Sequence, residues 1–300
     1  MSDFYYTLTE KDLIAIKVAT EYQEKNNVEY SKIVLEKIRL LLKLINSLYE
    51  EKIDIPVWKV WSEALIHKLC FHSTSLLKLY EGTTLPFENM GNQVVVLDKS
   101  SIISLLRVVT ENYLTFNFLY ANNISDVEKQ FRLSVWRYCG IKQRVEFDIS
   151  TEKAKKKQAE DVKLLEELKA EVVDSVYFKA FTAKEQQQIL KGRKPRLFNS
   201  WIGLIKQSGL RVRLFKNMYG YKSNYSHSEF ISVFQINSGI SQYNPNENVH
   251  SELILLHLII CKTIVDLKDT FPSILAFYSS SDSKIISEVD FLNRFASEEK

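Results

Sequence analysis

The chain has 300 residues, of which 45% are hydrophobic and 26% are charged, so it is long enough to bury a sizeable core and has the composition of an ordinary soluble protein. Its three cysteines, Cys70, Cys139 and Cys261, are far apart and form no C-x-x-C pair, which excludes a disulfide scaffold and a cysteine-based zinc site. A net charge of +3 is too small to indicate a partner by itself.

Helix-breaking residues are scarce, with 8 Gly and 5 Pro, whereas average usage is roughly 7% Gly and 5% Pro. This scarcity favours long helices joined by short links. The first residues, MSDFYYTLTEKDL, contain no basic region followed by an apolar run, so we expect no signal peptide there. The most apolar segment, LILLHLIIC (253–261), is shorter than the roughly 18 residues that span a bilayer, so it predicts a buried helix. We expect a soluble, cytoplasmic protein with no membrane contact.

Apolar residues at helical spacing predict an all-α fold, an irregular multi-helix bundle. A break near Asn26 divides the helical range 8–50, and Pro56 begins the range 56–80. Ser100 or Ser101 is the expected N-cap of the helix 100–121. The predicted helical ranges are 8–50, 56–80, 100–121, 124–146, 151–175, 183–191, 198–207, 210–226, 248–268, 273–278 and 283–296. Residues 82–93 predict a loop. The run QVVVL (93–97) is the one β-like segment, so no strand pair is expected.

The expected organisation is an N-terminal helical part (1–98), a central helical core (99–280) and a C-terminal tail helix (281–300). The segment 151–175 is an amphipathic helix inserted in the core, charged on most of its faces. We expect it at the surface, either as a solvated charge run or as a projecting surface for a partner protein.

Arg107 and Glu111 are the only charged residues between Ile102 and Tyr120, and their i, i+4 spacing places them on one helical face. Because an isolated buried charge is costly, the two must be paired or lie near a polar cavity. Two interpretations remain open: an internal salt bridge that fixes helix packing, or the wall of a polar pocket.

A basic block lies between Glu185 and Glu229, where the sequence contains no acidic residue. Its nine basic residues are Lys191, Arg193, Lys194, Arg196, Lys206, Arg211, Arg213, Lys216 and Lys222. Such a charge distribution attracts phosphate backbones. The candidate nucleic-acid-binding residues in this block are Arg193, Lys194, Arg196, Arg211, Arg213 and Lys216.

The basic block ends in the stretch YGYKSNYSHSEF (219–230), which surrounds His227 with tyrosine and serine hydroxyls. Helical spacing places Arg213, Asn217, Gly220, Asn224 and His227 on one polar stripe. The histidine could transfer protons, since its unperturbed pKa lies near physiological pH. Alternatively, the stretch is a helix junction in which serine caps the next helix.

Metal and nucleotide-triphosphate sites find little support. In HKLCFH, His67 and Cys70 share a helical face but His72 points away from it, and His250 and His257 lie two turns apart. The sequence lacks a Gly-rich phosphate loop, a G-x-S-x-G motif and a dinucleotide fingerprint. We therefore expect no metal and no cofactor.

Two of these motifs, taken together, resemble those of a known family of helical proteins. The R-x3-E element of Arg107 and Glu111, followed far downstream by Y-x4-S-H from Tyr221 to His227, resembles a family of bacterial all-helical proteins placed near the HEPN superfamily. The similarity covers residues 60–270 in the order of elements. It implies an all-α, commonly dimeric fold and, for many HEPN proteins, metal-independent ribonuclease activity in toxin or antiviral systems.

HEPN ribonucleases use an R-x4-6-H motif at the dimer interface, and this sequence departs from it. Lys222 stands five positions before His227, and Arg213 is too distant. The resemblance therefore implies the fold more strongly than the activity.

As a ribonuclease, the protein would use His227 as general acid or base, while Lys222 or Arg213 and Arg107, held by Glu111, would stabilise the scissile phosphate. Tyr221 or Tyr225 would stack on a base. A second hypothesis is a non-catalytic RNA-binding or sensing module in which His227 and the Arg107–Glu111 pair are structural. A third is an interaction scaffold. The expected partners are RNA and either a second copy or another protein bound through helical surfaces.

Overall fold

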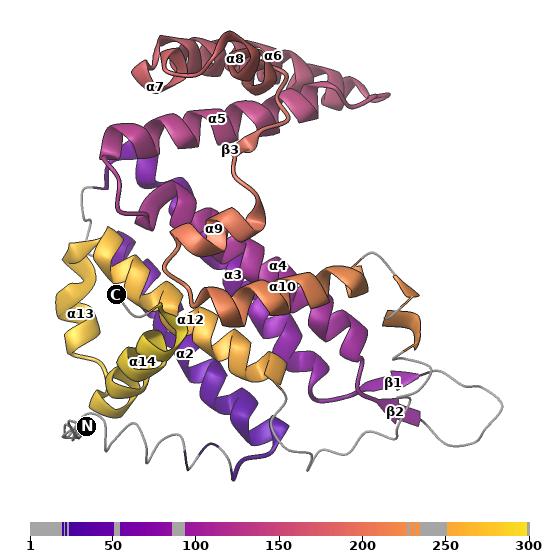
Figure 1. Ribbon diagram of the computed structural model, residues 1–300, viewed down its shortest axis with the longest axis vertical. Coiled ribbons are helices and arrows are strands. Elements are labelled where there is room, and N and C mark those ends of the chain that lie inside the picture. Colours follow the sequence, from indigo (N-terminus) through magenta and orange to yellow (C-terminus); the bar gives the residue numbers. More distant parts are fainter. Residues whose placement is uncertain are drawn as a thin grey trace, which may run out of the picture.

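The computed structural model describes residues 20, 22, 24–50, 55–85, 94–226, 229–230, 232–234 and 251–298. The expected all-α, multi-helix architecture is confirmed for these residues (Figure 1). The longer helices are α2 (Asn27–Glu50), α3 (Trp61–Leu79), α4 (Lys99–Phe116), α5 (Asp126–Val145), α6 (Glu152–Asp174), α10 (Val212–Ser226), α12 (Ser251–Thr270) and α14 (Ser283–Ala296). The shorter ones are η1 (Val57–Lys59), η2 (Asn117–Ala121), α7 (Val176–Lys179), α8 (Ala183–Leu190), α9 (Trp201–Gln207), η3 (Pro272–Ile274) and α13 (Leu275–Ser279).

Side-chain caps fix several helix starts. Thr151 and Ser200 each accept a hydrogen bond from a backbone amide in the first turn of α6 and α9. At α4, however, the cap is Asp98, whose carboxylate accepts from the amide of Ser101. The prediction of a serine cap is therefore wrong, because the preceding aspartate takes that role and draws both serines into the helix.

The expectation that no strands would pair is also wrong. Strand β1 (Thr83–Leu85) pairs antiparallel with β2 (Val94–Val96), with Thr84 opposite Val95. The β-branched valines of the predicted β-like run thus find partners in residues predicted as loop. A third extended segment, β3 (Pro195–Phe198), lies against α5.

Helix α12 lies at the centre of the main core and contacts α2, α4 and α14 (Figure 1). Every residue from 255 to 264 is buried, which confirms the prediction of a buried apolar helix. Helices α3 and α4 pack on each other, and α10 packs on α4. No helix in the described part of the chain combines the length and the apolar character needed to cross a membrane.

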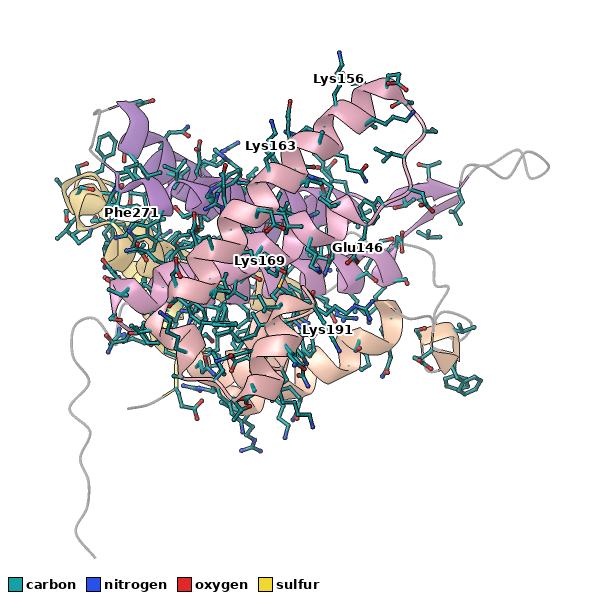
Figure 2. The ribbon with its side chains drawn as sticks, turned by 90° about the horizontal axis from the view of Figure 1, so that it is seen from above. Glu146, Lys156, Lys163, Lys169, Lys191 and Phe271 are labelled. Carbon is teal, nitrogen blue, oxygen red and sulfur yellow. The ribbon has the colours of Figure 1, made fainter. Side chains whose placement is uncertain are left out.

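Helices α5, α6, α7 and α8 form a second layer with its own apolar cluster (Figure 1). Leu168 and Val172 of α6 are fully buried in it, so the predicted helix 151–175 lies flat on α5. Its remaining faces are solvated and carry the exposed lysines Lys156, Lys163 and Lys169 (Figure 2). The charge run is therefore the outer face of a packed helix.

Two buried ionic groups join distant helices of the main core. Lys37 of α2 pairs with Glu288 of α14, and their side chains are 0% and 4% exposed. In the second group, Asp266 of α12 pairs with Lys262 and accepts hydrogen bonds from Tyr113 and from Asn117 of η2. Because a buried charge must be satisfied, these contacts fix which helices can pack together.

Candidate nucleic-acid interface

Arg107 and Glu111 lie on the face of α4 that meets α10. The Nε atom of Arg107 donates to Oε1 of Glu111 at 2.9 Å, and the two side chains are 16% and 24% exposed. The expectation that these charges are paired is confirmed. Both keep an edge toward solvent, so the pair lies at the rim of the core.

Tyr219 of α10 completes this group. Its hydroxyl donates to the same Oε1 of Glu111 at 2.7 Å and accepts from Nη2 of Arg107 at 3.4 Å. One turn later, the Oγ atom of Ser223 lies 3.5 Å from Nη1 of Arg107. We call Arg107, Glu111, Tyr219 and Ser223 the α4–α10 cluster.

Tyr219 and Arg107 both keep their protons at neutral pH. Burial raises the pKa of Tyr219, and the hydrogen bond to the Glu111 carboxylate raises it further. Burial by itself lowers the pKa of Arg107, but its bond to Glu111 and the nearby Tyr219 outweigh that effect and raise it overall. Tyr219 thus remains a hydrogen-bond donor, and Arg107 remains a cation.

A row of two aromatic rings with a guanidinium group at each end connects the basic block to this cluster. The guanidinium carbon of Arg196 lies 3.8 Å from the ring centroid of Trp201, whose ring lies 6.4 Å from that of Tyr219. On the other side of Tyr219, the guanidinium carbon of Arg107 lies 5.4 Å from the ring centroid. We call Arg196, Trp201, Tyr219 and Arg107 the cation–aromatic row. It runs from β3 through α9 and α10 to α4, and each of its members is partly buried.

The surroundings of the row are strongly basic. The exposed basic side chains are Lys191, Arg193, Lys206, Arg213 and Lys216. Two further cations lie beside aromatic rings: Lys194 is 5.4 Å from the ring of Phe198, and Arg211 is 5.0 Å from that of Phe295. Cationic heads with neighbouring rings are the side chains that contact phosphates and bases in single-stranded nucleic acid.

Tyr225 differs from its expected role. It is 6% exposed, and its hydroxyl is hydrogen-bonded to that of Tyr221 at 3.0 Å. Because the ring is in the core, it is not a surface on which a base can stack. Tyr221 is partly exposed beside it.

The two remaining predicted residues belong to the stretch 219–230. His227 lies outside the described residues, and its proposed role stays a prediction. Lys222 belongs to α10, but its side chain is also outside the described part. Upstream on the same helix, Arg213, Lys216, Asn217 and Gly220 are exposed, so the expected polar stripe faces solvent over these turns.

Tyr219 was missed at the sequence level. It lies four residues after the buried Phe215 and four before Ser223, and this spacing places all three on the face toward α4. The same spacing in the sequence could have indicated Tyr219 as a partner for the charged pair.

Among the histidines considered as metal ligands, His67 has other contacts. The Nδ1 atom of His67 lies 3.7 Å from Glu63, and the imidazole stacks on Phe71. Burial raises the pKa of the Cys70 thiol to about 12. Over the described ranges, no group of three His, Cys, Asp or Glu residues is arranged to hold a metal ion.

Comparisons with protein-family models, with curated proteins and with solved structures give no match for this chain.

Proposed function

We propose that this protein is an HEPN-like RNA-binding protein that binds single-stranded RNA on the face formed by β3, α9 and α10. The observation that carries this proposal is the cation–aromatic row, which continues from the basic block to the α4–α10 cluster. Rings between guanidinium groups offer stacking and phosphate contacts within one nucleotide spacing.

Charge and shape favour RNA as the ligand. The basic block contains nine cations and no acidic residue, so binding a phosphate backbone would release counterions. The rings of Trp201 and Tyr219 are partly buried. A base held in a duplex cannot reach them, whereas an unstacked base can.

We further propose that the bound RNA is cleaved without a metal, as in a bacterial toxin or antiviral system. His227 would serve as general acid or base, typically an effect of about 10² to 10⁴ in rate. Arg107, with Lys222, would stabilise charge on the phosphate. The terminal nitrogens of Arg107 lie 3.4 Å from the Tyr219 hydroxyl and 3.5 Å from Oγ of Ser223, both on α10.

One observation favours a non-catalytic module instead. Oε1 of Glu111 accepts hydrogen bonds from both Arg107 and Tyr219, which ties α4 to α10. In that case the α4–α10 cluster is a structural clamp, His227 is structural as well, and the protein senses or scaffolds RNA or a partner.

Binding is tested by fluorescence anisotropy with a labelled single-stranded RNA at several salt concentrations. The double variant Arg213→Glu, Lys216→Glu should weaken binding and flatten the salt dependence, since each lost phosphate contact changes the log–log slope by about 0.7. The matched control is Lys156→Glu, Lys163→Glu, which reverses two exposed lysines on α6. Equal affinities for the two double variants, or no salt-dependent binding at all, would reject the RNA-binding face.

Cleavage is tested in EDTA with Arg107→Ala and His227→Ala variants whose thermal stability matches that of the parent. Loss of cleavage in both, with RNA binding retained in His227→Ala, supports the ribonuclease. Binding without cleavage of any RNA supports the non-catalytic module.

A further inference from the structure

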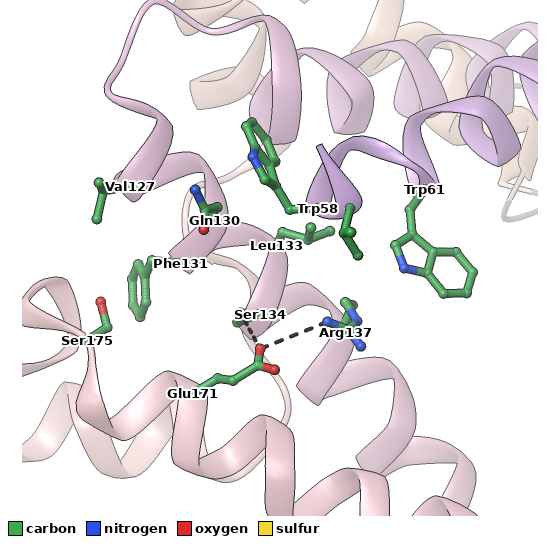
Figure 3. Close-up of a pocket in the computed structure, with 11 residues that line it drawn as sticks. Trp58, Trp61, Val127, Gln130, Phe131, Leu133, Ser134, Arg137, Glu171 and Ser175 are labelled. Carbon is green, nitrogen blue, oxygen red and sulfur yellow. Dashed lines mark hydrogen bonds and ion pairs between the residues drawn. The ribbon is translucent and has the colours of Figure 1, made fainter. Parts of the chain in front are cut away.

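A cavity of about 590 Å³ lies where the main core meets the second layer (Figure 3). Its walls come from η1 and the start of α3 on one side, and from α5 and the end of α6 on the other. None of its lining residues belongs to the basic block or to the α4–α10 cluster. It is thus a separate candidate site.

Exposed apolar side chains form one wall. Val57 is 86% exposed and Trp61 is 52% exposed, although both are large and apolar. Next to them, Trp58 stacks on Tyr120 with ring centroids 5.9 Å apart and an angle of 16° between the planes. Since Tyr120 is fully buried, it fixes the orientation of the Trp58 ring from behind. Exposed apolar groups around a preformed cavity indicate a binding site for a ligand with an apolar face.

A donor and an acceptor face this cavity from the opposite wall (Figure 3). Ser134 donates to Oε2 of Glu171 at 2.8 Å, while Nη1 of Arg137 lies 3.9 Å from the same oxygen. That separation is an ion pair without a hydrogen bond. Within the described part of the chain, neither the guanidinium of Arg137 nor Oε1 of Glu171 makes a hydrogen bond.

The opposite charges of Arg137 and Glu171 cancel, so the pocket favours a neutral ligand over a charged one. An anion would be attracted by one group and repelled by the other, and the same holds for a cation. A neutral, flat molecule with acceptors on one edge and donors on the adjacent edge satisfies both groups and also covers the tryptophan rings. A nucleobase has these properties, and a cavity of this size accommodates a nucleoside.

We propose that this cavity is a guanine-binding pocket. Guanine carries two acceptors, O6 and N7, that match an arginine fork, and amino hydrogens that match a carboxylate. Arg137 would bind the acceptor edge and Glu171 the donor edge, while Trp58 and Trp61 supply the stacking surface. Adenine lacks the paired acceptors.

The pocket is tested on the full chain by isothermal titration with guanosine, adenosine and cytidine. Guanosine should bind saturably and at least about tenfold more tightly than the other two, because a wrong base leaves a charged partner unsatisfied. Glu171→Gln, which keeps the acceptor for Ser134, should weaken guanosine binding about tenfold or more. Trp61→Ala should do likewise, and Glu167→Gln, an exposed carboxylate on the same helix, should have no effect.

A second titration separates the two sources of guanine. The pentanucleotides AAGAA and AAAAA are compared in the parent and in Glu171→Gln. A guanine-dependent affinity that Glu171→Gln removes assigns the pocket to RNA, and binding of guanosine alone assigns it to a free nucleoside or nucleotide. Absence of saturable guanosine binding would overturn the proposal, as would equal binding of adenosine or guanosine binding that neither pocket variant weakens.

Discussion

Replacing Tyr219 with phenylalanine removes one hydroxyl group and leaves the ring in place. The lost contacts are a 2.7 Å hydrogen bond to the carboxylate of Glu111 and a longer one, at 3.4 Å, from Nη2 of Arg107. Hydrogen bonds to charged groups contribute about 1.5–3 kcal/mol to stability, and neutral ones about 0.5–1.5 kcal/mol. Because Tyr219 and Glu111 are both partly exposed to water, which screens the interaction, we expect a loss of about 1–2 kcal/mol in the free energy of unfolding.

The assay is urea unfolding followed by circular dichroism at pH 7. The matched control is Tyr177→Phe, which removes an exposed hydrogen bond to the neutral Ser125 at 2.9 Å and should cost about 0.5 kcal/mol or less. Burial and the Glu111 contact raise the pKa of Tyr219 above its unfolded value of about 10. The contribution is therefore fully present below about pH 10 and is lost as pH rises through the folded-state pKa.

A double-mutant cycle with Glu111→Gln isolates the pair. Since the two residues are in contact, their effects should couple by at least about 0.5 kcal/mol. Additive effects, or a loss no larger than that of the Tyr177 control, would refute the clamp between α4 and α10. The ring remains in the cation–aromatic row, so RNA affinity should change by less than about twofold in Tyr219→Phe.

Three further outcomes follow from buried groups. Lys37→Met leaves Glu288 buried without its cationic partner and should cost about 3–5 kcal/mol in urea unfolding. Most of this loss should return when Glu288 is also replaced by Met, and a double variant as unstable as the single one would contradict this account. Burial raises the pKa of Cys139 to about 11 and that of Cys70 to about 12. Both thiols are therefore protonated at pH 8, and a disulfide reagent should label them only after unfolding. Rapid labelling of the native protein would contradict this prediction. Leu168→Ala should cost about 2–5 kcal/mol, because Leu168 is 0% exposed in the second layer, and a change below about 1 kcal/mol would show that α6 packs loosely.

The sequence predicted helices well where periodicity and caps agree. The segment predicted as 283–296 is helical over the same residues, and the one predicted as 151–175 begins at Glu152, one position after the Thr151 cap. The hairpin was missed because each strand has three residues, too few to show alternation, and because pairing depends on the partner strand.

The candidate site was predictable only in part. Arg107 and Glu111 stand out in the sequence because two charged residues in an otherwise apolar helix are costly to bury unless they form an ion pair. Their third partner, Tyr219, is 108 residues from Glu111, and three tyrosines of α10 look equivalent in the sequence. The spacing of Phe215, Tyr219 and Ser223 marks one face of α10, but only helix packing decides that this face meets α4 and that Tyr225 is buried.

The pairing of Lys37 with Glu288 has a consequence for synthesis of the chain. The two residues are 251 positions apart, and at about 5–20 residues per second the ribosome adds Glu288 about 13–50 s after Lys37. During that interval α2 cannot take its final place without burying an unpaired ammonium group. We therefore expect α2 to stay hydrated until α14 has been made, so that the main core closes late in synthesis.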